Sequence, residues 1–93
     1  MKVNFNQSFK DFKGKAIGVS IADEIGKVMF NLSATRDTPL TVNEKYMAYK
    51  LSLKMAREGE TEINVDEASF IVKVCGEYLT AGAYGQVKDL IEG

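Results

Sequence analysis

Residues 41–59, TVNEKYMAYKLSLKMAREG, carry the clearest structural signal in the chain. Thr41 and Glu44 have the spacing at which a hydroxyl and a carboxylate each accept a hydrogen bond from an unpaired amide at a helix start. Good helix formers follow, and one apolar row recurs at every fourth residue, at Met47, Leu51 and Met55. Gly59 suits the left-handed position that ends a helix. The sequence therefore predicts a helix that packs one face on a core.

Three further segments show helical periodicity. Ser20 and Asp23 form a second capping pattern, and the helix expected after them has an apolar face made of Ile21, Ile25, Val28, Met29 and Leu32. Asp66 is expected to cap a third helix, whose apolar side consists of Phe70, Ile71, Val74, Tyr78 and Leu79. Gly82 is expected to end or bend that helix, and helical spacing resumes in residues 83–92 through Val87, Leu90 and Ile91.

Short strands are expected before and between these helices. The apolar residues of KVNFNQSF, residues 2–9, fall on alternate positions, which is the period of a half-buried strand. Gly14 supplies a turn and Ala16–Ile17 returns as a second strand, so we expect a β-hairpin. TEINV, residues 61–65, predicts a short third strand in the same way. The side chains expected in the core include Phe5, Phe9 and Phe30.

The predicted fold is therefore a mainly helical α+β domain that covers residues 1–93. Its order is an N-terminal β-hairpin, two helices, a short third strand and two C-terminal helices. A chain of 93 residues makes one domain of ordinary size, with no room for a second.

The charge and cysteine content indicate the compartment in which the protein acts and the classes of partner that it binds. The 12 basic and 13 acidic residues give a net charge of −1, whereas binding to duplex nucleic acid needs a concentrated basic face. The single Cys75 cannot form an internal disulfide, which favours the reducing cytoplasm. No apolar run is long enough for a secretion signal or a membrane span. We therefore expect neither duplex nucleic acid nor a membrane as a partner.

The chain offers few groups for bond-making chemistry. Histidine, the commonest general base and a frequent zinc ligand, is absent. Cys75 lies inside a predicted helix without a histidine to lower its pKa, so we interpret it as structural. Most close acidic pairs fall at predicted helix ends, where capping and solvation explain them. We predict no catalytic residue, no metal site and no cofactor, and expect that the protein is not an enzyme.

The segment YLTAGAYGQVKDLIEG, residues 78–93, holds the candidate binding residues. Its glycines could let backbone amides approach a phosphate at a helix start, or they could form the joint between two helices. Its tyrosines suit stacking on a nucleobase, anchoring a protein, or rimming the chain's own core. The site predicted for a signalling nucleotide consists of Tyr78, Tyr84, Gly82, Gly85, Lys73 and Lys88. Since one small chain has little interior, such a pocket is expected between the protomers of a homo-oligomer.

Four segments also carry a family resemblance: NFNQSFKDFKGKAI (4–17), NEKYMAYKLSLKM (43–55), INVDEASFIVKV (63–74) and GQVKDLIEG (85–93). With them, nearly the whole chain resembles a family of small, mostly uncharacterised proteins encoded in tailed-phage and prophage genomes. The segment VMFNLSATRDT, residues 28–38, departs from the more uniformly aliphatic pattern of that family. The resemblance implies a virus-encoded accessory protein that acts in the cytoplasm of a host bacterium, and it transfers no catalytic residue.

Two functions are consistent with these observations. The first is a phage-encoded, non-enzymatic binding protein, such as an anti-defence inhibitor, that blocks a host protein or sequesters a small nucleotide signal. The alternative is an accessory or chaperone protein in the assembly of tailed-phage virions. A bound nucleotide would favour sequestration, whereas co-purification with virion proteins would favour assembly.

Overall fold

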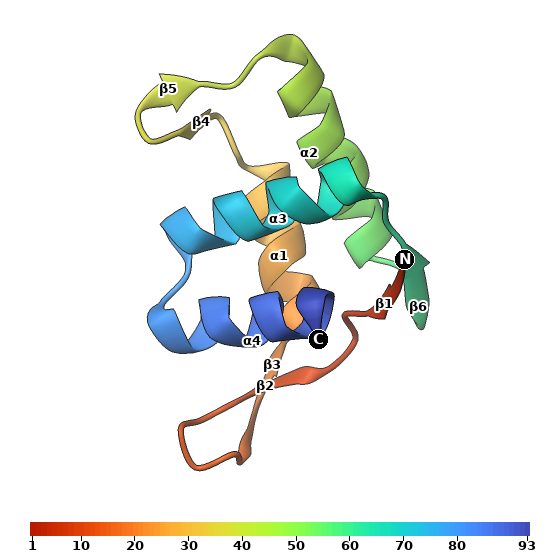
Figure 1. Cartoon of the computed structure of the whole chain (residues 1–93), viewed down its shortest axis with the longest axis vertical. Coiled ribbons are helices and arrows are strands. Elements are labelled where there is room, and N and C mark those ends of the chain that lie inside the picture. The colour runs from red at the N-terminus through yellow and green to blue at the C-terminus, as the bar shows by residue number, and fades with distance from the viewer.

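Four helices form the body of the molecule in the computed structural model, which describes all 93 residues (Figure 1). They are α1 (Ile21–Phe30), α2 (Val42–Met55), α3 (Val65–Tyr78) and α4 (Ala81–Glu92). α1 packs along α2, and α3 packs against α4 and α1. In Figure 1, α3 and α4 lie one above the other nearer the viewer, with α1 and α2 behind them. All four predicted helices are confirmed, and none is both long and apolar enough to cross a membrane.

The capping patterns read from the sequence fix the starts of α1 and α2. The Thr41 hydroxyl accepts a hydrogen bond from the Glu44 amide at 3.1 Å, and the Glu44 carboxylate accepts one from the Thr41 amide at 2.9 Å. The hydrogen bond from the Thr41 backbone holds the pKa of Glu44 below its ordinary value. Ser20 likewise accepts a hydrogen bond from the Asp23 amide at 3.3 Å. Both helix starts are therefore confirmed at the atomic level.

The boundaries predicted for the last two helices need correction. The cap of α3 is Asn64 rather than Asp66, because Asn64 and Glu67 form the reciprocal capping pair, at 2.8 and 2.9 Å. Asp66 instead lies in the first turn, where its charge complements the positive end of the helix. Gly82 does not end or bend α3, which ends at Tyr78; it lies in the first turn of α4.

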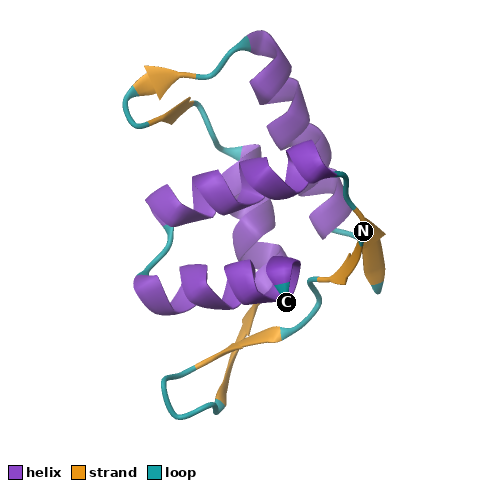
Figure 2. Cartoon of the chain, viewed as in Figure 1, coloured by secondary structure: helices purple, strands orange, loops and turns teal.

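Six short strands form three separate two-stranded antiparallel sheets (Figure 2). The pairs are β1 (Lys2–Asn4) with β6 (Glu60–Glu62), β2 (Ser8–Lys10) with β3 (Ala16–Ser20), and β4 (Ala34–Thr35) with β5 (Thr38–Pro39). The β2–β3 pair confirms the predicted hairpin. The third strand predicted over residues 61–65 is confirmed only in part, because the strand ends at Glu62, Asn64 caps α3 and Val65 begins that helix. The observed fold is accordingly an α+β domain, as expected.

The single strand predicted over residues 2–9 is wrong, because the segment is divided between two sheets. Between β1 and β2, the Phe5 and Gln7 carbonyls accept hydrogen bonds from the Ala22 and Ile21 amides at 3.0 and 2.8 Å. These amides begin α1 and have no partner inside the helix, so they draw the backbone out of a continuous strand. The alternating apolar side chains are nevertheless buried as predicted: Val3, Phe5 and Phe9.

The β4–β5 hairpin was not predicted from the sequence. Its turn places Arg36 and Asp37 at φ values of +46° and +63°. Two consecutive positive φ values are typical of the tight turns that match strand twist, and these turns usually contain asparagine or glycine. This turn has arginine at its first position, and Pro39 lies in its second strand, so the hairpin could not be predicted from its turn residues.

One apolar core of 19 buried residues lies between the helices. The β1–β2 connection and all four helices contribute to it, as shown by the fully buried side chains Phe5, Ile25, Leu51, Ile71 and Val87. The expectation that Phe30 lies in this core is wrong, since its side chain is 64% exposed. Phe30 is the last residue of α1, and the preceding Met29 occupies the inward position.

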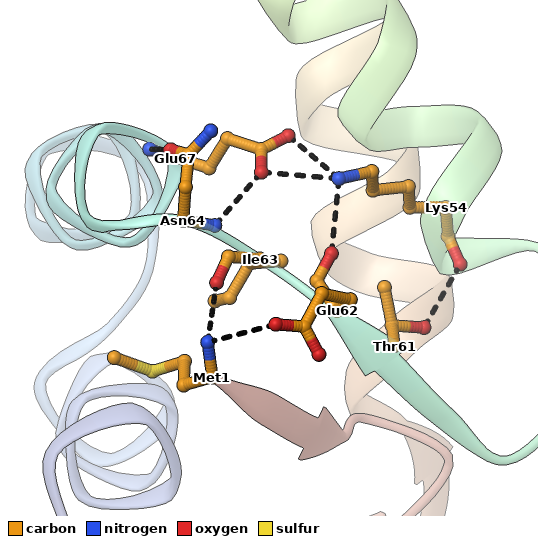
Figure 3. A network of polar contacts seen from close by, with 7 residues as sticks. All are labelled: Met1, Lys54, Thr61, Glu62, Ile63, Asn64 and Glu67. Carbon is orange, nitrogen blue, oxygen red and sulfur yellow. Dashed lines mark hydrogen bonds and ion pairs between the residues drawn. The ribbon is translucent and has the colours of Figure 1, made fainter.

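A polar network ties the end of α2 to β6 and the start of α3 (Figure 3). The Lys54 ammonium donates to both carboxylate oxygens of Glu67, at 3.0 and 2.9 Å, and to the Glu62 carbonyl at 2.9 Å. Burial acts to raise the pKa of Glu67, but hydrogen bonds from Lys54 and Asn64 and the Lys54 charge outweigh it and lower the pKa. The network is therefore a structural element that fixes the α2–α3 connection.

Candidate binding cleft

The six residues predicted to bind a ligand do not meet in one pocket. Tyr78 and Gly82 line one cleft, whereas Lys73 lines a separate polar pocket beside the β4–β5 hairpin. Tyr84 packs its ring on Gly76 of α3, and a Cβ at Gly76 would lie 3.3 Å from that ring. Lys88 is exposed on α4.

The glycines of α4 have ordinary helical roles. Thr80 caps the helix by accepting a hydrogen bond from the Ala83 amide at 3.3 Å. Neither Gly82 nor Gly85 has a positive φ, and a Cβ at either would meet no atom within 4 Å. The segment is the joint between two helices, and the glycine that permits close packing there is Gly76, which the sequence reading did not single out.

The polar pocket beside Lys73 has a volume of about 470 Å³ and is lined by two cations and one carboxylate. Arg36 and Lys73 face it together with Glu44. Arg36 also pairs with Glu77: its side chain lies 3.4 Å from one carboxylate oxygen, and its backbone amide donates to the other at 3.0 Å. Glu77 thus offsets the Arg36 charge. Lys73 is close enough to Glu44 for its charge to lower the pKa of that carboxyl, so the attraction of the pocket for a phosphate is reduced.

A second opening, which we call the hairpin cleft, lies between the β2–β3 hairpin and the α3–α4 joint. Its volume is about 480 Å³. Apolar walls come from both sides: Phe9, Phe12, Ile17 and Val19 from the hairpin, and Tyr78, Leu79 and Ala83 from the helices. Polar groups complete its lining, namely Lys10, Asp11, Glu24, Thr80, Gly82 and Gln86. The cleft thus has the mixed apolar and polar lining of a binding site.

Gln86 fixes one wall of this cleft to the other. Its side-chain oxygen accepts a hydrogen bond from the Lys10 amide at 2.8 Å, and its side-chain nitrogen donates to the Lys10 carbonyl at 3.0 Å. The same nitrogen donates to the Gly82 carbonyl at 3.0 Å. The carboxamide therefore takes the place of a neighbouring strand and binds the outer edge of β2 to α4.

The hairpin turn is also held by its own hydrogen bonds. One Asp11 carboxylate oxygen accepts from the Lys13 and Lys15 amides, at 2.9 and 3.0 Å. Gly14 adopts φ +84°, a conformation that glycine alone adopts without strain, and its amide donates to the Asp11 carbonyl at 2.9 Å. This turn holds Phe12 out in solvent, with the Lys13 ammonium 5.7 Å from the ring centre.

The cleft was only partly visible in the sequence. Tyr78 and Gly82 belonged to the predicted site, but Ile17 was interpreted only as a strand residue and Val19 was not singled out. A usable signal existed, because a two-stranded hairpin has one face to bury. The segment KDFKGKAIGV, residues 10–19, contains more apolar side chains than a hairpin that buries one face and exposes the other would need.

A second exposed aromatic group lies on α1 and α2. Phe30 and Tyr49 have ring centroids 6.4 Å apart, and Tyr46 and Tyr49 are 6.3 Å apart. An open groove of about 380 Å³ runs beside them between the two helices. The rings lie close to one another and all three remain exposed, so this face is a second apolar surface of the chain.

The single thiol of the chain lies out of contact with solvent. Cys75 is fully buried, and burial raises the pKa of its thiol to about 12. No group of three or more acidic or cysteine side chains lies together in a way that could hold a metal ion.

No protein-family model matches the chain, and no curated protein and no solved structure is significantly similar to it.

Proposed function

We propose that this chain is a phage-encoded, non-enzymatic binding protein that blocks a protein of the host bacterium, and that the hairpin cleft is its contact surface. The observation that carries the proposal is the exposure of large apolar side chains around that cleft. Phe12 is 96% exposed, Ile17 is 53% exposed and Tyr78 is 51% exposed. A contiguous apolar surface with polar residues around it is typical of a protein interaction site.

The chemistry of the cleft supports a protein partner over a nucleotide. Ile17, Val19 and Leu79 are aliphatic and offer no flat face to a base. Phe9 is buried, which leaves Phe12 and Tyr78 as the exposed rings of the lining. Glu24 lies in the same lining, where its charge would repel a phosphate. Lys73, which was expected to meet such a phosphate, lines a different pocket.

A role without catalysis is supported by the state of the thiol and the acids. A thiol with a pKa of about 12 is almost entirely protonated at neutral pH, so Cys75 is a poor nucleophile. Glu44 and Glu67 are engaged in helix capping. The phage origin, and with it action in the host cytoplasm, rests on the family resemblance of the sequence.

The test compares two substitutions that remove an exposed apolar side chain and add one negative charge. Ile17→Glu changes the cleft, whereas Val42→Glu changes the first turn of α2, away from it. Proteins retained from a host lysate by the tagged chain are identified, purified and titrated against both variants. We expect one host protein to bind the wild type and Val42→Glu equally, and to bind Ile17→Glu at least about tenfold more weakly.

Each alternative has its own outcome in this design. If every retained protein binds Ile17→Glu as tightly as the wild type, the hairpin cleft is not the contact surface. A virion protein as the cleft-dependent partner would establish the assembly role instead. A nucleotide that stays bound in a native mass spectrum, to one protomer or to a dimer, would establish sequestration.

A further inference from the structure

The β2–β3 hairpin carries a concentration of positive charge that the rest of the chain does not neutralise. Residues 10–15 hold three lysines and one acid in a chain whose net charge is −1. All three lysines are exposed, and none forms an ion pair in the structure: Lys10, Lys13 and Lys15. The one acid, Asp11, already accepts two hydrogen bonds from the turn's backbone. The lysine charges are therefore free to meet an external partner.

This charge lies beside the apolar cleft. The hairpin extends away from the helical body in Figure 1, with its turn at the far end. Lys10 lines the hairpin cleft itself, together with Phe12 and Ile17. A partner that fills the cleft thus meets apolar side chains and the Lys10 ammonium in the same contact, and Lys13 and Lys15 lie on the same hairpin outside the cleft lining.

The hairpin is also held in place before any partner arrives. Gln86 binds both backbone groups of Lys10, and the Ser8 hydroxyl accepts a hydrogen bond from the Gly18 amide at 3.1 Å. Gly18 has φ +76° at a point where the strand register shifts. A contact surface fixed in this way loses little conformational entropy on binding, which favours affinity.

We infer that the partner's contact element is an acidic polypeptide segment with one large apolar side chain. The apolar side chain enters the hairpin cleft, and the flanking carboxylates pair with Lys10, Lys13 and Lys15. This inference deepens the proposed function and depends on it, since it names the chemistry of the protein that the cleft binds. The volume of about 480 Å³ lies in the range of pockets that enclose a ligand group.

A single-stranded nucleic acid is the other anionic partner that lysines and an aromatic ring could bind, and the cleft fits it less well. Such sites place several aromatic rings along a basic track so that successive bases stack. Here Phe9 is buried, which leaves Phe12 and Tyr78 as the exposed rings of the lining, and the other apolar walls are aliphatic. Successive bases would therefore find no continuous row of rings on which to stack.

The experiment is a selection of binders from a randomised library of twelve-residue peptides on the immobilised chain. We expect the enriched peptides to carry net negative charge around one large apolar residue. Changing Lys10, Lys13 and Lys15 to glutamine together should weaken their binding about tenfold, as should a rise in salt concentration. The matched control changes Lys2, Lys45 and Lys50 to glutamine, three exposed lysines outside the cleft lining, and should leave binding unchanged.

The outcomes separate this inference from the proposed function. Enriched peptides without net negative charge, whose binding is lost in Ile17→Glu, would overturn the acidic segment and leave the cleft as the contact surface. Peptide binding that survives Ile17→Glu, or no enrichment at all, would overturn both. A twelve-residue oligothymidylate that binds and depends on the three hairpin lysines would replace the acidic segment with single-stranded nucleic acid.

Discussion

The hydrogen bonds of Gln86 lead to a prediction about how the hairpin is attached. The substitution Gln86→Ala removes three hydrogen bonds, two to the Lys10 backbone and one to the Gly82 carbonyl. Each is worth about 0.5–1.5 kcal/mol net, with the lower end expected here because water can reach the freed groups. Alanine recovers a few tenths of a kcal/mol through its helix propensity. We therefore expect the free energy of unfolding to fall by about 1–2 kcal/mol.

The assay combines chemical denaturation with amide hydrogen exchange. The Lys10 amide donates to Gln86, so its exchange should become at least about tenfold faster in the variant. Amides in the middle of α3 should exchange faster only in proportion to the fall in global stability. The matched control is Gln7→Ala, which removes the other glutamine and one local hydrogen bond, to the Asn4 carbonyl.

Two results would refute this reasoning. If the Lys10 amide exchanges at the wild-type rate, Gln86 does not hold the hairpin in solution. If stability falls by more than about 3 kcal/mol, the side chain supports the core rather than one edge of the hairpin.

Three further predictions concern the network, the thiol and a glycine. The pKa of Glu67 is lowered by folding, so its stabilising contribution is fully present above its unfolded pKa and is lost as the pH falls through its folded pKa. Glu67→Gln should thus cost more stability at pH 7 than at pH 3, and equal costs in denaturation curves at the two pH values would contradict this. Native Cys75 should resist a thiol-specific reagent at pH 8 and react at once in denaturant, whereas fast labelling of the folded protein would show that the helix exposes it. Gly85→Ala should raise the free energy of unfolding by about 0.5–1 kcal/mol, because the position is helical and an added Cβ meets no atom within 4 Å; a loss of stability would show a constraint at that position.

The sequence predicts the helices well because their signals are local. Thr41 with Glu44 and Ser20 with Asp23 satisfy amides within their own turns, so spacing alone identifies them. The start of α3 shows the limit of this reading. Asn64 and Asp66 are both good capping residues, and only the reciprocal bond to Glu67 distinguishes them.

Features that depend on contacts between residues far apart in the sequence could not be predicted in this way. The break in the strand at Phe5 exists because the first amides of α1 need acceptors from elsewhere in the chain. The cleft likewise exists because Gln86 reaches the backbone of a residue 76 positions earlier. Tyr78 and Gly82 could be chosen from their own segment, but the opposite wall depends on this long-range contact. Lys73 was assigned to the wrong pocket because periodicity predicts the helix but not which neighbouring element each side of the helix faces.

The pairing of β1 with β6 is expected to form late when this chain folds. The two strands come from opposite parts of the sequence, so most of the chain must be looped before they can meet. The entropy of closing that loop is unfavourable until other contacts have shortened it, whereas the β2–β3 hairpin and the helices form from neighbouring residues. Substitutions in β1 are therefore expected to accelerate unfolding while leaving the refolding rate almost unchanged.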